Sequence, residues 1–464
     1  MVFPTLLFVL FLTVVLTLNA ALARGPATLR KSVLTLASYI FYAAWDWRFC
    51  FLMAGVSAIA WAAGLGVRHP RYGALVRIAA LTALLATLAV FKYFGFFFLS
   101  LQQLLSDTAL MRDLTWMRVV LPVGISFYTF QAISYVMDVQ RGDVAARRSP
   151  LDVALYISFF PQLVAGPIVR AADFLPQLDT PGVVTRAMRG TAILLILTGL
   201  FKKMVVANYL STLLVDPVFG FPDGAGALAA TLATLGYGLQ IYCDFSGYSD
   251  IAIGVALLLG YRFVRNFDQP YRARGLADFW RRWHISLSTW IRDYLYIPLG
   301  GSRGAPTRVA LTLIVTMTLA GLWHGAGWNF LAWGFLHGAA LATERALRPH
   351  APRVLAPLGW AVAMVVVFAL WIPFRAPDWA TTQAMLAAFG RADALVPLAV
   401  TPQIAALLAI GLAMNWLPLR WRDGAETALQ RVPAAAQAAI LATGTLLLFA
   451  VAQDGVAPFI YFQF

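Results

Sequence analysis

Residues 77–100 read RIAALTALLATLAVFKYFGFFFLS, a stretch that is apolar over nearly its whole length. A transmembrane helix needs about 20 predominantly apolar residues, and this stretch is long enough to be one. Similar stretches recur along the 464 residues, at 3–22, 33–48, 49–66, 116–137, 151–168, 187–213, 226–260, 308–326, 328–346, 354–374, 400–418 and 436–456. The sequence therefore predicts an all-α, polytopic membrane protein of roughly ten helices, forming a single domain over residues 1–464.

These apolar stretches differ in length and regularity. The 33–48 and 49–66 stretches are short for a full crossing, and 226–260 is long enough for a tilted helix and a re-entrant piece. Proline or glycine interrupts the chain at 121–128, 160–162 and 166–167, either as packing kinks or because the backbone there lines a cavity. We therefore expect a bundle that contains short and re-entrant helices.

The charge of the chain is small in amount and strongly positive. Charged residues make up 12% of the chain and hydrophobic residues 61%, whereas a soluble domain carries about 25% charged residues. The formal net charge of +14 comes from arginines in short segments between apolar stretches, as the positive-inside rule describes. This pattern argues against nucleic-acid binding and predicts a multi-pass protein of the cell inner membrane, surrounded by lipid.

Basic residues also predict the orientation in the membrane. Arg24, Arg30 and Lys31 follow the first apolar stretch, which places the N-terminus outside. Residues 262–308 are rich in arginine and are predicted to face the cytoplasm.

Two carboxylates interrupt the apolar stretch at 226–260. Asp244 and Asp250 belong to the segment YCDFSGYSD at 242–250. Ionised acids within a membrane are costly unless they are paired or face water. We therefore expect a polar cavity or an arginine partner for them.

Residues 276–295 combine tryptophans with basic residues. The apolar positions recur at helical spacing and are Leu276, Trp280, Trp283, Leu287, Trp290, Ile291 and Tyr294. In one continuous helix, the polar side chains of Arg281, His284, Ser288 and Arg292 would lie within about 80° of one another. The segment is therefore either an interfacial amphipathic helix, or a polar stripe that faces a phosphate-bearing substrate. In the second case Arg281, Arg282 and Arg292 are the candidate charge partners, and Ser288 is a further candidate binding residue.

The five histidines differ in their surroundings. His69 and His350 lie in arginine-rich segments and are expected to be solvated, whereas His337 lies in an apolar stretch and is expected to be a hydrogen-bonded core residue. His324 lies between tryptophans in the glycine-rich segment GLWHGAGWN at 321–329. Burial there would keep its imidazole neutral at pH 7, as a general base requires. The sequence contains no His-Glu-x-x-His metal motif, nucleophile elbow or P-loop, so no metal is expected.

Longer runs of the sequence resemble one known family. Residues 121–138, 159–170, 237–250, 266–301 and 322–338 are similar to the membrane-bound O-acyltransferases, most closely to their alginate-type bacterial branch. The phrases FWRRWH at 279–284 and LWHG at 322–325 are specific, and FIYFQF at 459–464 is similar to the same branch.

The resemblance implies acyl transfer to a hydroxyl group in a bundle around a central tunnel. His324 matches the family's catalytic histidine and His284 its second active-site position, where it would orient the donor or stabilise an oxyanion. Trp323, Tyr242 and Asp244 would line the wall. The family further implies no tightly bound cofactor, a cytoplasmic acyl donor that is acetyl-CoA or an acylated carrier protein, and an extracytoplasmic acetyltransferase partner.

Several functions remain open at this stage. The favoured one moves an acetyl group to a cell-surface polysaccharide such as alginate. Alternatives within the family are D-alanyl transfer and acyl transfer to peptidoglycan. A different class is a transporter that carries an acyl donor or glycan without chemistry, because broken helices with polar centres are also typical of transporters.

Overall fold

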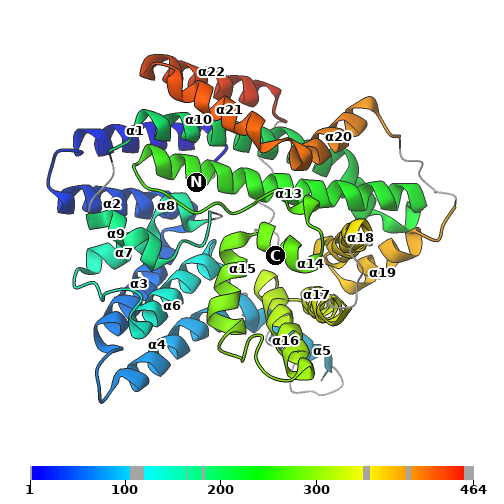
Figure 1. The fold of residues 1–464 in the computed structure, drawn as a ribbon, viewed down its shortest axis with the longest axis horizontal. Coiled ribbons are helices and arrows are strands. Elements are labelled where there is room, and N and C mark those ends of the chain that lie inside the picture. The colour runs from blue at the N-terminus through cyan, green and yellow to red at the C-terminus, as the bar shows by residue number, and fades with distance from the viewer. Residues whose placement is uncertain are drawn as a thin grey trace. The chain divides into compact units, whose positions relative to one another are not determined.

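A computed structural model describes residues 3–104, 120–164, 166–179, 183–347, 356–392 and 399–453. The secondary structure within these ranges is entirely helical (Figure 1), which confirms the all-α prediction. Seven described helices are long and apolar enough to cross a membrane, or eight if the bent pair α20 (Pro402–Trp416) and α21 (Leu419–Arg431) is one span. This number is smaller than ten because several apolar stretches form short helices. His350 and the 459–464 motif lie outside the described residues.

The chain forms two compact units, and the first comprises residues 1–185 and 255–263. Its helices are α1 (Leu6–Ala21), α2 (Ala27–Asp46), α3 (Arg48–Gly66), α4 (Gly73–Leu88), η1 (Ala89–Tyr93), α5 (Phe94–Leu104), α6 (Ile125–Arg141), α7 (Pro150–Ser158), α8 (Phe160–Leu163) and α9 (Ala171–Asp179). The α4, η1 and α5 segments form one apolar helix over 73–102, which is the stretch quoted at the outset. The proline and glycine at 122 and 124 precede α6, and Gly124 has a φ of 74°.

Basic residues of α2 contribute to the interior of this first unit. Arg30 is buried and donates hydrogen bonds to Asn19 Oδ1 at 2.8 Å and to the Leu259 carbonyl at 2.9 Å. Lys31 Nζ lies 2.7 Å from Asp152 Oδ1. Buried cations require such partners, so these two residues stabilise the packing of the unit as well as contributing positive charge.

The second unit comprises residues 186–254 and 264–464. Its helices, with α13 running on into the first unit, are α10 (Arg186–Leu200), η3 (Phe201–Ala207), α11 (Asn208–Leu210), η4 (Ser211–Val215), α12 (Asp216–Gly220), η5 (Pro222–Gly224), α13 (Ala227–Leu258), η6 (Pro270–Arg272), α14 (Leu276–Arg282), α15 (Ile285–Ile291), η7 (Arg292–Tyr296), α16 (Pro306–His324), α17 (Trp328–Leu347), α18 (Ala356–Arg375), α19 (Trp379–Ala388), α20, α21 and α22 (Ala434–Val451). The expected re-entrant piece within 226–260 is wrong, because α13 is one unbroken helix of 32 residues.

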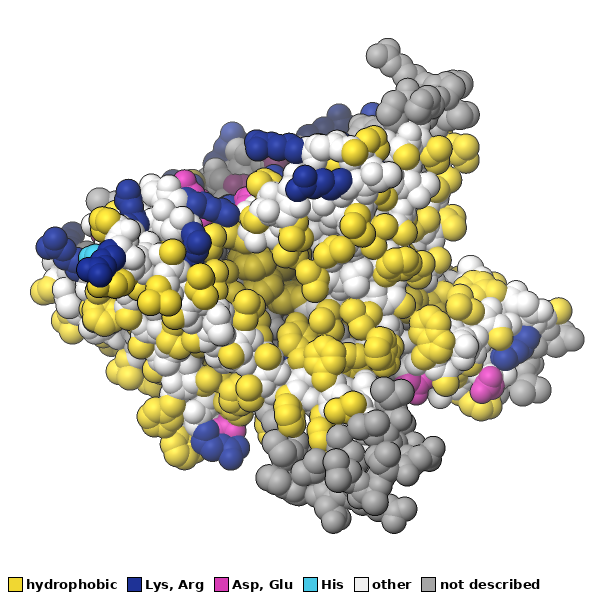
Figure 2. Space-filling view, turned by 90° about the horizontal axis from the view of Figure 1, so that it is seen from below, with side chains coloured by type: hydrophobic (Ala, Val, Ile, Leu, Met, Phe, Trp, Pro, Cys, Tyr) yellow, Lys and Arg dark blue, Asp and Glu magenta, His cyan; other side chains and the backbone are white. Residues whose placement is uncertain are grey.

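The C-terminal helices present much of their surface outward. The axes of α20 and α21 differ by 86°, and no residue of α21 is buried. Both α21 and α22 pack on α10 (Figure 1). In α22 only Gln437 is buried, and Leu446 and Leu447 are exposed. Broad areas of hydrophobic side chains cover the face shown in Figure 2, as expected for a protein whose solvent is lipid.

Glycines bring α16 and α17 into direct backbone contact. A Cβ added to Gly321 would meet the Phe330 carbonyl, and one added to Gly334 would meet the Met317 carbonyl. Small residues allow membrane helices to approach this closely. Because α16 ends at His324, this close packing fixes where that imidazole lies relative to α17.

We expect Gly334→Val to separate α16 from α17 and to lower the free energy of unfolding by about 1–3 kcal/mol, the usual cost of overpacking. The imidazole of His324 should be displaced as well, because α16 ends at that residue. Gly424→Ala is the control, since a Cβ there meets no atom within 4 Å. The thermal midpoint of each purified variant measures the effect. Equal midpoints for Gly334→Val and wild type would contradict the assigned packing.

Candidate active site

The predicted helix over 276–295 is interrupted at His284. The α14 helix ends at Arg282 and α15 begins at Ile285, while His284 adopts the left-handed conformation with a φ of 42°. The predicted polar stripe of Arg281, His284, Ser288 and Arg292 is therefore wrong, because a stripe requires one continuous helix. A left-handed conformation is unfavourable for a residue with a side chain, and such strain is concentrated at functional sites.

Asn266 holds the chain in this interrupted form. The Ile285 backbone N–H donates to the Asn266 carbonyl at 2.9 Å, and the Ser286 N–H donates to Asn266 Oδ1 at 3.2 Å. The Ser286 hydroxyl donates to the same Oδ1 at 2.9 Å, and Asn266 Nδ2 donates to Ser249 Oγ at 3.0 Å. Asn266 therefore supplies the hydrogen bonds that a continuous helix would otherwise make within itself.

The same asparagine selects the tautomer of His284. His284 Nδ1 lies 3.2 Å from Asn266 Oδ1, an oxygen that already accepts from the Ser286 backbone. Because this oxygen is an acceptor, the neutral imidazole carries its proton on Nδ1. Its Nε2 then has a lone pair, so that this atom accepts a hydrogen bond rather than donating one.

Burial keeps the imidazole of His284 neutral. The side chain is fully buried, and the ring of Phe245 lies against it at 4.5 Å between centroids. Removal from water lowers the pKa of His284 to about 3, because desolvation disfavours the imidazolium. The ring is therefore a proton acceptor throughout the neutral pH range.

This lowered pKa predicts how stability depends on pH. Above pH 6.5, His284 is neutral in both folded and unfolded chains. Below pH 6.5 only the unfolded chain binds the proton, so acid favours unfolding, by up to about 1.4 kcal/mol per pH unit. We expect the thermal midpoint of His284→Asn to fall less between pH 7.5 and 5.5 than that of the wild type. His69→Asn, a change at an exposed site, should follow the wild type. Parallel curves for His284→Asn and wild type would show that His284 is not buried neutral.

His324 is enclosed by aromatic rings at the end of α16. It is 3% exposed. Its ring meets those of Trp323, Trp333 and Phe374 edge to face, at centroid distances of 5.0, 5.1 and 5.3 Å. The edges and faces of these rings separate the imidazole from solvent.

Trp323 connects the two histidines. Its indole lies 6.3 Å from the His284 ring and 5.0 Å from the His324 ring. The three predicted residues His284, Trp323 and His324 thus form one buried cluster in the second unit. Tyr242 lies beside the same buried cluster, with its ring 6.4 Å from that of Trp283. Ser288 donates to the Trp283 carbonyl at 3.1 Å and so secures the backbone beside His284.

The two acids of α13, for which a polar cavity or an arginine partner was expected, are paired with lysines. Lys203 Nζ forms a buried ion pair with Asp244 Oδ1, and Lys202 Nζ lies 2.7 Å from Asp250 Oδ2. Lys202 Nζ also lies 5.7 Å from the centre of the Tyr242 ring. Both lysines belong to the π-helical segment η3, and π segments are frequent at functional sites. Asp244 therefore fixes α13 to η3, and Phe245 follows it against His284.

A cavity of about 1310 Å³ opens elsewhere in the second unit. Its apolar walls come from α17 and α18, and its polar wall from residues 268–282. Four arginines and three carboxylates line it, namely Arg272, Arg274, Arg281, Arg282, Asp268, Asp278 and Glu344. The predicted Arg281 and Arg282 therefore face a common space, although not on the stripe from which they were inferred.

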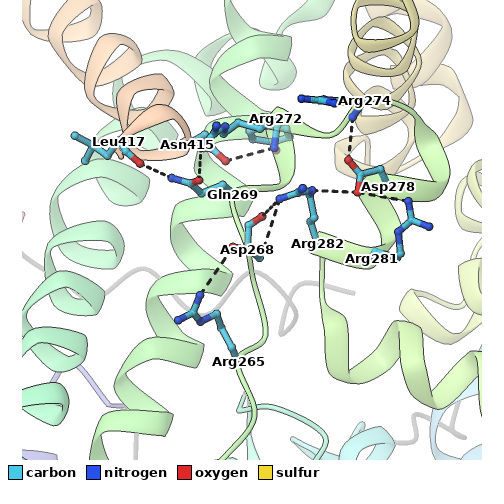
Figure 3. Close-up of polar contacts among 11 residues, drawn as sticks. Arg265, Asp268, Gln269, Arg272, Arg274, Asp278, Arg281, Arg282, Asn415 and Leu417 are labelled. Carbon is cyan, nitrogen blue, oxygen red and sulfur yellow. Dashed lines mark hydrogen bonds and ion pairs between the residues drawn. The ribbon is translucent and has the colours of Figure 1, made fainter. Parts of the chain in front are cut away.

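The arginines of this cavity differ in their pairing (Figure 3). Arg282 contacts Asp278 at 3.2 Å and Asp268 at 3.4 Å, and it is only 31% exposed. Arg281 lies 3.6 Å from Asp278 and is 65% exposed. Burial alone would raise the pKa of Asp278, but the Arg274 backbone N–H and the Arg282 guanidinium outweigh it and hold that pKa below its usual value. Arg282 is thus a structural cation.

The sequence did not identify Arg272 and Arg274 as candidate site residues. Both side chains are exposed at the cavity, and neither guanidinium has a carboxylate partner among the described residues. Arg272 donates to Gln269 Oε1 at 2.7 Å and lies over the ring of Trp416. With Arg281, they are the cations of the cavity that remain available to an anion.

Two buried imidazoles beside one indole are an arrangement suited to proton transfer inside an all-helical membrane protein. The sequence profile of the membrane-bound O-acyltransferase family matches residues 72–377, which contain both histidines and Trp323. The chain belongs to the membrane-bound O-acyltransferase family, and it is an O-acyltransferase.

Individual relatives agree with this assignment. A probable alginate O-acetylase of Azotobacter vinelandii is 41% identical over 78% of this chain and 73% of its own length. A probable alginate O-acetylase of Pseudomonas putida is 36% identical over 94% of this chain and 94% of its own length. The peptidoglycan O-acetyltransferase of Helicobacter pylori is 35% identical over 77% of this chain and 73% of its own. The family membership favours an enzyme over the transporter alternative.

Proposed function

We propose that this enzyme transfers an acetyl group from a thioester donor to a hydroxyl group for O-acetylation of a cell-surface polysaccharide, as in alginate. The observation that carries the proposal is the placement of His324 and His284 on the same tryptophan, Trp323. Relatives named for alginate acetylation, alike over three quarters or more of this chain, support the acetyl group and the polysaccharide.

His324 is the proposed base. As the acceptor oxygen attacks the thioester carbonyl carbon, the hydroxyl proton passes to the neutral imidazole. A carbon–oxygen bond forms, the carbon–sulfur bond breaks, and the imidazolium returns the proton to the departing thiolate. The products are an ester and a free thiol. The surrounding aromatic rings exclude water, which would otherwise compete for the acetyl group.

His284 is proposed to orient a reactant. The tautomer imposed by Asn266 makes Nε2 an acceptor, so it is suited to a hydroxyl or amide N–H of a substrate rather than to an oxyanion. The strained backbone of His284 fits a residue whose ring direction matters more than its local stability.

The cavity at Arg272, Arg274 and Arg281 is the proposed entrance for the donor. Exposed guanidinium groups favour phosphate, and acetyl-CoA and acylated carrier proteins both present a phosphate-bearing thiol arm. The positive-inside rule supports a cytoplasmic location for this entrance and insertion in the inner membrane. A separate extracytoplasmic acetyltransferase is the proposed partner that delivers the acetyl group to the polymer.

Deletion of the gene for this chain tests the acceptor. We expect base-labile acetate to disappear from the surface polysaccharide and to remain on peptidoglycan. Re-introduction of the wild-type chain should restore it. Loss from peptidoglycan alone would contradict the proposed acceptor and favour the activity for which the H. pylori relative is named.

A further inference from the structure

The first turn of α17 lies beside His324. The α16 helix ends at His324, and α17 begins at Trp328 after the short loop 325–327. Three glycines bring the two helices into backbone contact, and the contacting pairs are Gly338 with Ile314, Gly334 with Met317 and Gly321 with Phe330. Continued to the end of α16, this antiparallel register brings His324 level with the start of α17. Asn329 is the second residue of that helix and therefore lies close to the proposed base.

Residues on both sides of Asn329 contact the ring of His324. Trp333, one turn further along α17, lies 5.1 Å from that ring between centroids, and Phe374 of α18 lies 5.3 Å from it. Asn329 Nδ2 donates a hydrogen bond at 3.1 Å to the carbonyl of Ala376, two residues beyond Phe374. The side chain of Asn329 is thus held between two residues that enclose the proposed base.

The hydrogen bond to Ala376 fixes the orientation of the Asn329 carboxamide. A backbone carbonyl can only accept, so the group that contacts it is the nitrogen, and Oδ1 occupies the other branch of the amide. Asn329 is 5% exposed, and its Oδ1 is buried without a hydrogen-bond partner among the described residues. A buried acceptor without a partner is costly. An acceptor held in this position indicates a ligand that supplies a hydrogen-bond donor.

Two other buried residues differ from Asn329. Asn415 Oδ1 accepts from the Tyr271 backbone N–H at 3.4 Å, and its Nδ2 donates to the Gly411 carbonyl at 3.3 Å, so both ends of that amide are paired. His337 is buried as expected, but its Nδ1 does not make the hydrogen bond expected of a core residue with any part of the chain that the structure describes. It lies eight residues beyond Asn329 on α17, which is about 12 Å along the helix.

The ligand group that pairs with Asn329 Oδ1 is not the reacting hydroxyl. A hydroxyl has one proton, and in the proposed reaction this proton passes to His324. Oδ1 therefore requires a second donor on the acceptor molecule. A sugar carries such a donor, the hydroxyl on the neighbouring ring carbon, whereas an acceptor with an isolated hydroxyl does not.

We propose that Asn329 binds the acceptor and selects one with two neighbouring hydroxyl groups. One hydroxyl reacts and gives its proton to His324, while its neighbour donates a hydrogen bond to Asn329 Oδ1. This inference rests on the proposed function and assigns the acceptor specificity within it.

The alternative is that Asn329 only ties α17 to α18 through its Nδ2. Substitutions separate the two ends of the amide. Asn329→Leu and the smaller Asn329→Ala remove both ends, whereas Asn329→Asp loses the amide N–H and keeps an acceptor oxygen, whether ionised or not. A purely structural role predicts that no substitution changes the preference between acceptors. The proposed role predicts that the apolar variants lose this preference and that Asn329→Asp keeps it.

The experiment uses the full chain in lipid vesicles, with acetyl-CoA and an acetylated carrier protein as donors. Three acceptors are compared: an alginate oligosaccharide, the same oligosaccharide with one hydroxyl of each neighbouring pair replaced by hydrogen, and a serine-containing peptide. Asn415→Leu is the matched control, because it removes a buried asparagine whose amide is paired within the protein. Acceptor-dependent release of thiol gives kcat and KM, and the thermal midpoint shows whether each variant is folded.

For the wild type we expect kcat/KM to be roughly 3- to 10-fold higher with the intact oligosaccharide than with its deoxygenated form, corrected for the number of hydroxyl groups, which is the usual effect of one hydrogen bond. Asn329→Leu and Asn329→Ala should lose this preference through a lower kcat/KM with the intact oligosaccharide, and they should keep the wild-type KM for the donor. Asn329→Asp and Asn415→Leu should keep the preference.

Four results would overturn this assignment while leaving acyl transfer intact. They are a wild type without the preference, a wild type that favours the peptide, a folded apolar variant that keeps the preference, and loss of the preference in Asn329→Asp or Asn415→Leu. If the wild type releases thiol from neither donor with any acceptor, the proposed function itself fails, and this assignment fails with it.

Discussion

Replacing His324 by alanine is expected to lower kcat for acetyl transfer by about 10²–10⁴-fold, the usual contribution of a general base. His324 is 3% exposed and is surrounded by Trp323, Trp333 and Phe374. In the variant no imidazole would take the hydroxyl proton during attack on the thioester. The measurement is the rate of thiol release by the purified protein at saturating concentrations of acceptor and donor.

The control for this variant is His69→Ala, because His69 is exposed in the first unit and should leave the rate unchanged. The thermal midpoint of His324→Ala shows whether the variant is folded. A folded His324→Ala protein with the wild-type rate would show that His324 is not the general base.

The largest expected effect on stability comes from Lys203. Its side chain is 1% exposed, and its ammonium group pairs with the buried Asp244 carboxylate. Lys203→Met would leave a buried negative charge without this cation, which costs about 3–5 kcal/mol. We expect a large fall in the free energy of unfolding and low yields of purified protein.

The double variant Lys203→Met with Asp244→Leu separates charge from packing. Replacing both members of a buried ion pair by apolar residues is often neutral or stabilising, so we expect the double variant to regain most of the lost stability. Arg48→Met removes an exposed cation that pairs with Asp46 and should leave the midpoint unchanged. A double variant as unstable as Lys203→Met would show that packing, not charge, is responsible.

The features predicted well from the sequence are those carried by local composition and by short motifs. Apolar stretches such as 77–100 predicted helices, because satisfying backbone hydrogen bonds in lipid depends mainly on the stretch itself. The phrases around His284 and His324 placed both residues at one site, and the structure brings both rings to Trp323. Their chemical roles stay predictions until the variants are measured.

The features missed depend on contacts between distant residues. The periodicity of 276–295 predicted one helix, but Asn266, 18 residues before His284, ends it by hydrogen bonding to Ile285 and Ser286. Lys203 lies 41 residues from Asp244, so no spacing within 226–260 could identify that partner. The adjacent Lys202 and Lys203, in the middle of the largely apolar stretch 187–213, were the available signal.

The cavity was also beyond prediction from the sequence. Its arginines belong to one short region, but its apolar wall comes from α17 and α18. Arg272 and Arg274 appeared only as members of a charged segment, whereas the structure shows them exposed at the cavity and Arg282 paired with two carboxylates. The arginines therefore differ in whether a carboxylate pairs with them, and these pairs can be identified only from the three-dimensional structure.

The most direct measurement is the stoichiometry of a single reaction by the purified chain in lipid vesicles, supplied with an acetyl thioester and an oligosaccharide acceptor. The account predicts one new acetyl ester on the acceptor for each thiol released, neither without acceptor, and neither with His324→Ala. Undiminished ester and thiol from folded His324→Ala protein, or no ester from the wild type with every thioester donor, would contradict it.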